Sequence, residues 1–150
     1  MKNIFRTKDC HEFENRINQL TSESKALWGK MNVAQMLAHC NVAYEMTYED
    51  IHPKPNAFVR IILKLLVKNS VVNEKPYPKN NHTAPQFIIK NERNFDIERG
   101  RLLSYLNKTH EMGESNFEGK ESLSFGKLSA AEWNNMFAKH LDHHLNQFGV

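Results

Sequence analysis

Residues 128–150 read LSAAEWNNMFAKHLDHHLNQFGV, and this stretch at the end of the chain decides the fold. Ser129 and Glu132 stand three residues apart, the spacing of a capping box that satisfies the first free backbone N–H groups of a helix. Gly149 is a helix stop signal. These signals predict one long helix between the capping box and that glycine.

Two histidines of this helix are predicted to face the interior. At about 100° per residue, the apolar side chains form one broad arc. The arc consists of Trp133, Met136, Phe137, Leu141, Leu145 and Phe148. His140 and His144 fall within it, one turn apart, and His143 lies with Gln147 on one shoulder. The opposite side carries Lys139, Asp142 and Asn146.

The i, i+4 pair of imidazoles has two interpretations. A buried ring needs a partner, because leaving its polar atoms unsatisfied costs roughly 1–3 kcal/mol. The two rings can be satisfied separately, as ordinary core histidines, or they can bind one metal ion together. The H-x-x-x-H spacing alone does not decide between these alternatives.

Size and composition predict one soluble globular domain over residues 1–150, with 40% hydrophobic and 25% charged residues. The 20 Lys/Arg and 17 Asp/Glu are well mixed, so no basic block indicates nucleic-acid binding. No apolar run is long enough for a membrane span, and the first residues lack the apolar core of a signal peptide. Cys10 and Cys40 are too few for a disulfide framework. We therefore expect a cytoplasmic protein with neither nucleic-acid nor membrane partners.

Four further segments have helical patterns of apolar residues. They are Lys8–Leu20, Val33–Glu49, Ala57–Val72 and Asn94–Glu111. The third is strongly apolar and is a candidate homodimer surface. Long loops are predicted over Asn73–Gln86 and Gly113–Lys127, and no strand pair is predicted. The fold class is therefore all-α, a helix bundle with long connecting loops, of the kind that builds metal sites from facing helices.

A third histidine is predicted to reach the same interior. His39 lies on the flank of the buried face of the second helix, so it can meet His140 and His144 if the two helices are neighbours. Three protein nitrogens leave coordination positions open for water or substrate, as in catalytic metal sites. An all-imidazole set suits Zn, Ni, Cu or Fe. We interpret His143 as a group behind the ligands or at the surface, in preference to a ligand.

Two motifs resemble a known group. WGKMNVAQMLAHCNVAYE (Trp28 to Glu45) and FGKLSAAEWNNMFAKHLDHHLNQFG (Phe125 to Gly149) are similar to the DinB-like superfamily, and more closely to an uncharacterised branch ending in HLDHHLxQFG. The resemblance implies a four-helix bundle whose divalent metal is held by a histidine of the second helix and an H-x-x-x-H pair of the last. In this chain those residues are His39, His140 and His144. Relatives include thiol-dependent transferases and isomerases that use low-molecular-weight thiols such as bacillithiol or mycothiol.

The leading functional hypothesis is an enzyme dependent on a divalent metal ion, with Zn or Ni as the expected ion. A small thiol or activated water would be its nucleophile, His143 its best candidate for a catalytic base, and a small molecule its substrate. The alternative is a non-enzymatic metal-binding or stress-response module. The resembling branch often carries His-Pro before the Phe-Gly that precedes the last helix, whereas this chain has Leu123-Ser124. That departure weakens any function that depends on this loop.

Overall fold

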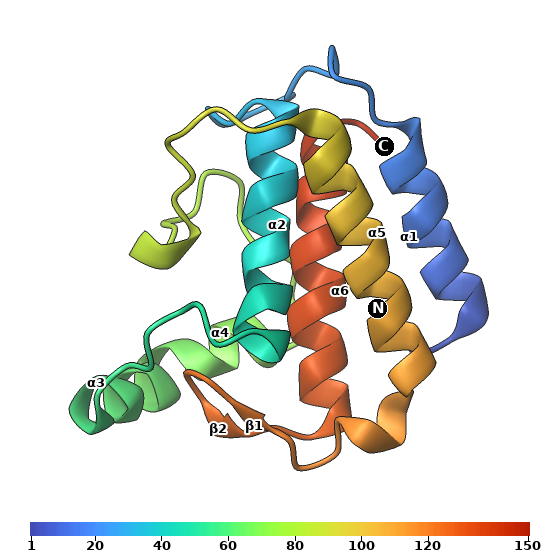
Figure 1. Ribbon diagram of the computed structural model, residues 1–150. Helices are drawn as coiled ribbons and strands as arrows, with labels where there is room; N and C mark the ends of the chain where they lie inside the picture. Colours follow the sequence, from blue (N-terminus) through green and yellow to red (C-terminus); the bar gives the residue numbers. More distant parts are fainter.

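Four long helices make up the body of the protein, whose computed structural model describes residues 1–150 (Figure 1). They are α1 (Thr7–Gln19), α2 (Val33–Tyr48), α5 (Phe95–Met112) and α6 (Ala130–Gln147). Helix α2 packs against α5, and α6 contacts both α1 and α2. The mostly helical content agrees with the predicted all-α class. No helix has the length and apolar character needed to cross a membrane.

Capping boxes fix the starts of the two helices that carry the histidines. The side chains of Asn32 and Ser129 accept from the backbone N–H groups of Gln35 and Glu132, whose side chains accept in return from the cap residues. Each such cap stabilises a helix by about 1 kcal/mol. The capping box predicted for the last helix is confirmed, and Gln35 proves to be a capping residue.

Helix α6 supplies the centre of the hydrophobic core. Its Trp133, Phe137, Leu141 and Leu145 are each at most 1% exposed. The Phe137 ring stacks on Tyr44 of α2, with centroids 4.6 Å apart. Because this apolar arc is wide, α6 lies between α1 and α2, and its histidines are carried into the α2 interface.

The helical wheel was wrong about Lys139, which it placed on the solvent side of the last helix. Lys139 is only 3% exposed. Its ammonium donates to the carbonyl oxygens of Ser70 and Asn73, at 2.9 and 2.7 Å. The reason is tertiary: α4 (Lys68–Val72) packs against α6 and covers this side of it. Burial lowers the pKa of Lys139 to about 8.

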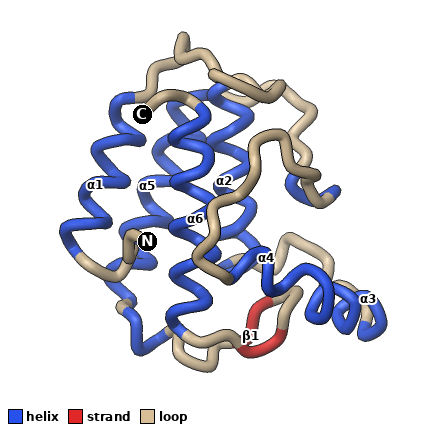
Figure 2. Tube along the Cα trace, turned by 180° about the vertical axis from the view of Figure 1, so that it is seen from behind, coloured by secondary structure: helices blue, strands red, loops and turns tan.

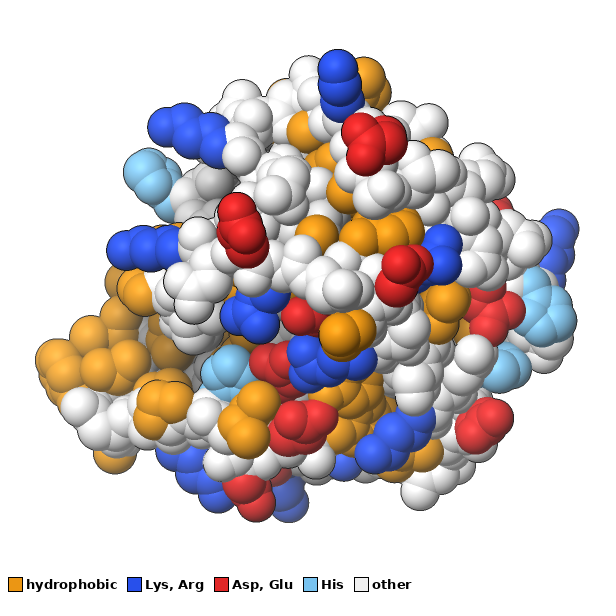
Figure 3. Space-filling view, turned by 45° about the horizontal axis from the view of Figure 1, so that its top comes forward, with side chains coloured by type: hydrophobic (Ala, Val, Ile, Leu, Met, Phe, Trp, Pro, Cys, Tyr) orange, Lys and Arg blue, Asp and Glu red, His pale blue; other side chains and the backbone are white.

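An arm projects sideways from the four long helices (Figure 1). It consists of α3 (Ala57–Ile62), a π-helical turn (Leu63–Val67) and α4, so the helix predicted over Ala57–Val72 is present with a π turn in its middle. Its outer face is apolar and exposed, as the gathering of hydrophobic side chains at the left edge of Figure 3 shows. Leu65 and Leu66, for example, are 74% and 77% exposed. The homodimer expected from this helix stays a prediction.

Two connections complete the chain. The sequence predicted no strand pair, yet β1 (Glu121–Ser122) and β2 (Gly126–Lys127) form an antiparallel hairpin. Strands of two residues carry no readable alternation, which explains the error. The predicted loop after α4 passes over α6 and α2 (Figure 2) and ends in a short 3₁₀ turn, Pro85–Phe87.

Candidate metal centre

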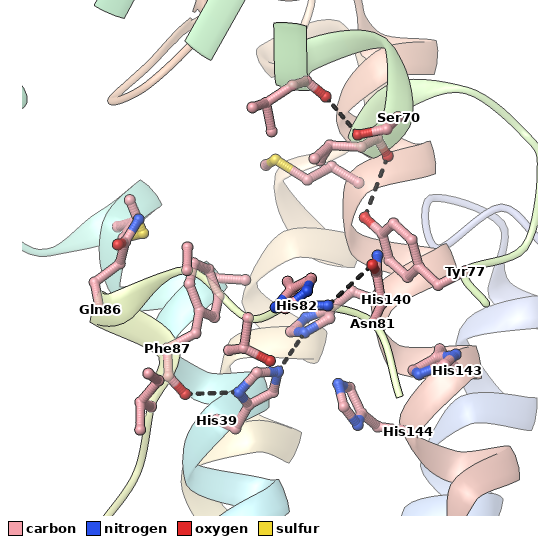
Figure 4. Close-up of a pocket in the computed structure, with 18 of the residues that line it drawn as sticks. His39, Ser70, Tyr77, Asn81, His82, Gln86, Phe87, His140, His143 and His144 are labelled. Carbon is pink, nitrogen blue, oxygen red and sulfur yellow. Dashed lines mark hydrogen bonds between the residues drawn. The ribbon is translucent and has the colours of Figure 1, made fainter. Parts of the chain in front are cut away.

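Three histidines from two helices converge at the α2–α6 interface (Figure 4). The ring centroid of His39 lies 4.8 Å from that of His140 and 4.5 Å from that of His144, and the last two are 4.8 Å apart. One potential ligand nitrogen of each ring lies within 4.8 Å of those of the other two. The meeting of the three rings, expected if the two helices were neighbours, is therefore present in the structure.

Oxygen acceptors orient two of the three rings. Nδ1 of His39 lies 2.8 Å from the carbonyl oxygen of Phe87, and Nδ1 of His144 lies 2.8 Å from Oε1 of Gln147. A ring nitrogen facing an oxygen acceptor must carry the proton, so Nε2 of each ring keeps its lone pair. The Gln147 amide is itself oriented, because its Nε2 donates to the carbonyl oxygen of Trp28 at 2.7 Å. Metal-binding histidines are held in this way by hydrogen bonds behind the ring.

The electrostatics of the cluster favour neutral imidazoles. Burial lowers the pKa of His39, and it lowers the pKa of His144 to about 3. The pKa of His140 lies well below its usual range because of burial and then the neighbouring His144 and His39. Neutral imidazole is the form that binds metal ions. Three neutral nitrogens facing one another are thus a donor set that fits a divalent transition-metal ion.

The cluster lies in the wall of a cavity of about 610 Å³. No Asp, Glu or Arg lines the cavity, and Lys30 is its one lysine. Cys40, next to His39 in the sequence, is not in the lining; burial raises the pKa of its thiol, which points to Met36. The cavity therefore offers the cluster neither a carboxylate nor a thiolate as a fourth ligand.

Comparison with protein families assigns the chain over nearly its whole length. Residues 2–149 match the family described as "Protein of unknown function (DUF1569)". The chain belongs to this family. Searches of curated proteins and of solved structures found no match. Membership brings no activity with it, and the match does not link the chain to the DinB-like superfamily.

The structure keeps His143 out of the cluster of three, although it lines the same cavity. Its ring centroid lies 5.0 Å from that of His144, and its ring packs between Trp28 and Tyr77, at 6.0 and 5.8 Å. Burial lowers its pKa, so the ring is neutral at pH 7. Its role as a base stays a prediction.

Sequence reasoning missed how Gln147 and Gly29 serve this site. A Cβ on Gly29 would lie 2.4 Å from Nε2 of Gln147, and Gly29 has a φ of +85°. Glycine is therefore required there, both for the backbone conformation and for the approach of the amide that orients His144. The sequence put Gln147 beside His143 on the helix, but no local pattern relates it to a glycine more than a hundred residues earlier. His82, in the long loop, is exposed and lines the cavity without joining the cluster.

Proposed function

We propose that this protein binds one divalent metal ion, Zn or Ni, through Nε2 of His39, His140 and His144. The observation that carries the proposal is the convergence of three buried or half-buried rings from two helices, all neutral at pH 7. Hydrogen bonds to Phe87 and Gln147 leave two of these rings with Nε2 as the free donor atom. Nε2 of His140 and Nε2 of His39 lie 2.9 Å apart, within hydrogen-bond distance, and in the proposal the ion replaces this hydrogen bond between the two rings.

We further propose that the ion serves catalysis rather than only stability. Structural zinc sites are closed by four protein ligands, whereas catalytic sites keep a position open. Here three nitrogens face a large cavity whose lining contains no carboxylate or thiolate. The open arrangement supports a metal-dependent enzyme over the alternative, a metal-binding stress-response module.

In this proposal the chain positions the metal ligands, surrounds them with a partly apolar wall and supplies a base. A divalent ion, when bound, lowers the pKa of a coordinated water or thiol so that a nucleophile exists at neutral pH. Phe87 and Gln147 hold the ligand rings in place, and apolar side chains form much of the cavity wall beside them. Neutral His143 takes up the proton that the nucleophile releases, acting as a general base on a small-molecule substrate.

The DinB-like resemblance agrees with this arrangement and is part of the proposal. It implies a four-helix bundle with one ligand on the second helix and an H-x-x-x-H pair on the last. His39 lies on α2, and His140 and His144 lie on α6, packed against it. On this basis we propose a low-molecular-weight thiol as the first nucleophile to test.

Metal analysis of protein purified without an affinity tag tests the metal site. We expect one Zn or Ni per chain in the parent and none in His39→Ala or His140→Ala. His11→Ala, which removes an exposed histidine of α1, is the matched control and keeps the metal. A parent protein that takes up no Zn or Ni on titration would refute the site.

A panel of thiol-transfer and hydrolysis assays tests the enzyme proposal. We expect His143→Gln to retain the metal and to lose most of the turnover, since a positioned base contributes typically about 10²–10⁴-fold. Equal turnover in the parent and in His39→Ala would exclude a metal-dependent reaction.

A further inference from the structure

The apolar part of the cavity begins at the histidine cluster and extends along both helices toward the hairpin. Thr47 and Met46 lie about two turns after His39 on α2, and Met136 and Trp133 lie one and two turns before His140 on α6. All four line the cavity. Two helical turns correspond to a depth of about 10 Å from the cluster.

The arm and the hairpin line the far end of this space, with serines and with further apolar groups. The arm contributes Leu63, Val67 and Val71, and the hairpin contributes Leu123 and Phe125. The outward-facing Leu65 and Leu66 of the same arm do not line the cavity. The hydrophobic surface inside the cavity is thus separate from the exposed face of the arm. A ligand that fills this part of the cavity needs an apolar body.

The charge of an ion bound at the cluster sets the other requirement on the ligand. Three neutral imidazoles leave a divalent ion with both of its positive charges, and no carboxylate in the cavity compensates them. An uncompensated charge away from water is costly. An anionic donor group carried by the ligand offsets this cost, so one end of the ligand is anionic.

We propose that the cavity binds a small amphipathic anion: one acidic head group on the ion held by His39, His140 and His144, and one apolar body along α2 and α6 toward the hairpin. This inference rests on the proposed metal site. It narrows the substrate class to molecules with a single anionic end and an apolar part that reaches two helical turns from the cluster.

Titration of straight-chain carboxylates into Zn-loaded protein tests the proposal by calorimetry, independently of turnover. From acetate to octanoate we expect affinity to rise about three- to fourfold for each added methylene, the increment for transferring that group out of water. Octanoate is expected to bind with a stoichiometry of one, and 1-octanol, which lacks the anionic head, much more weakly. Octanoate is also expected to bind much more weakly to metal-free His39→Ala.

Two variants locate the apolar body. Met46→Glu places a carboxylate in the apolar wall, and we expect it to keep the Zn and lose the dependence on chain length. Leu66→Glu, on the exposed face of the arm, is the matched control and keeps that dependence. If Met46→Glu fails to fold by circular dichroism, Val67→Glu changes the same wall.

The outcomes separate this inference from the proposed function. Acetate and octanoate binding equally to Zn-loaded protein would overturn the inference and leave the metal site standing. Loss of the chain-length dependence in Leu66→Glu would overturn it too, because the exposed face would then be the binding surface. If the parent protein binds no Zn, both the proposed metal site and this inference are refuted, because the anionic head group then has no ion to bind.

Discussion

At the scale of single residues, Gln147 determines how His144 faces the candidate ion. Replacing it with Leu keeps the volume but removes the acceptor for Nδ1 of His144 and the donor to Trp28. Hydrogen bonds behind a ligand typically contribute about 10–100-fold to metal affinity, and we expect Gln147→Leu to lose that much in a competitive Zn titration. Gln147→Glu, which restores an acceptor, should recover part of the loss.

The matched control for this change is Gln19→Leu, at the exposed end of α1. It makes the same chemical substitution at a residue that does not line the cavity, so Zn affinity should equal that of the parent. Equal affinity in Gln147→Leu and Gln19→Leu would contradict the positioning role of Gln147.

His144 also makes the metal-free protein sensitive to acid. The pKa of His144 is lowered to about 3 in the folded state, so below the usual value of about 6.5 the unfolded chain binds a proton that the folded chain does not. The contribution of His144 to the free energy of unfolding is therefore fully present above pH 6.5 and is lost progressively as the pH falls toward 3. Urea unfolding with a chelator present, from pH 7.5 to 5, should show His144→Gln losing less stability than the parent. The difference is about 1.4 kcal/mol per pH unit below 6.5, the value for one proton. Equal dependence of the free energy of unfolding on pH in the parent and in His144→Gln would contradict a buried neutral His144.

At the scale of elements, α6 contributes to the fold through its aromatic arc. Phe137 is 1% exposed and stacks on Trp133 and Tyr44, with centroids 5.5 and 4.6 Å apart. Phe137→Ala leaves a cavity there, and we expect it to lower the free energy of unfolding by about 3–5 kcal/mol in chemical denaturation. Leu66→Ala, at a position 77% exposed, should stay within about 0.5 kcal/mol of the parent. Similar losses in the two variants would mean that α6 does not hold the core.

The sequence predicted those elements whose signals are local. The capping box of α6, its apolar arc and the inward pair His140 and His144 all follow from spacing within one helix. The burial of Lys139 could not be predicted, because it depends on carbonyl oxygens at the end of α4 that approach only in the folded chain. The β1–β2 hairpin is too short to leave a pattern.

The orientation of the cluster was beyond prediction for the same reason. Phe87 orients His39 through a backbone carbonyl oxygen, a group that every residue has, so its side chain gives no signal. Gly29 matters because it makes room for Gln147, a contact across most of the chain length. Spacing therefore identified the pair His140 and His144 and placed His39 on a buried flank, and only the structure showed that the three rings meet and what holds them.

At the scale of the whole molecule, the candidate ion joins parts of the chain that are far apart in sequence. Its ligands come from α2 and α6. The carbonyl oxygen of Phe87 orients His39, and the carbonyl oxygen of Trp28 holds Gln147, which orients His144. An ion that binds only the folded state stabilises it by about 2.7 kcal/mol at one hundred times its dissociation constant. For a chain of this length that corresponds to a rise in Tm of roughly 5–10 °C, measured by differential scanning calorimetry. We expect the parent to show this rise with Zn and to lose it with a chelator, whereas His140→Ala should show neither change and His11→Ala should behave as the parent. An equal rise in His140→Ala would mean that Zn acts elsewhere on the molecule, because this variant lacks one of the three proposed ligands.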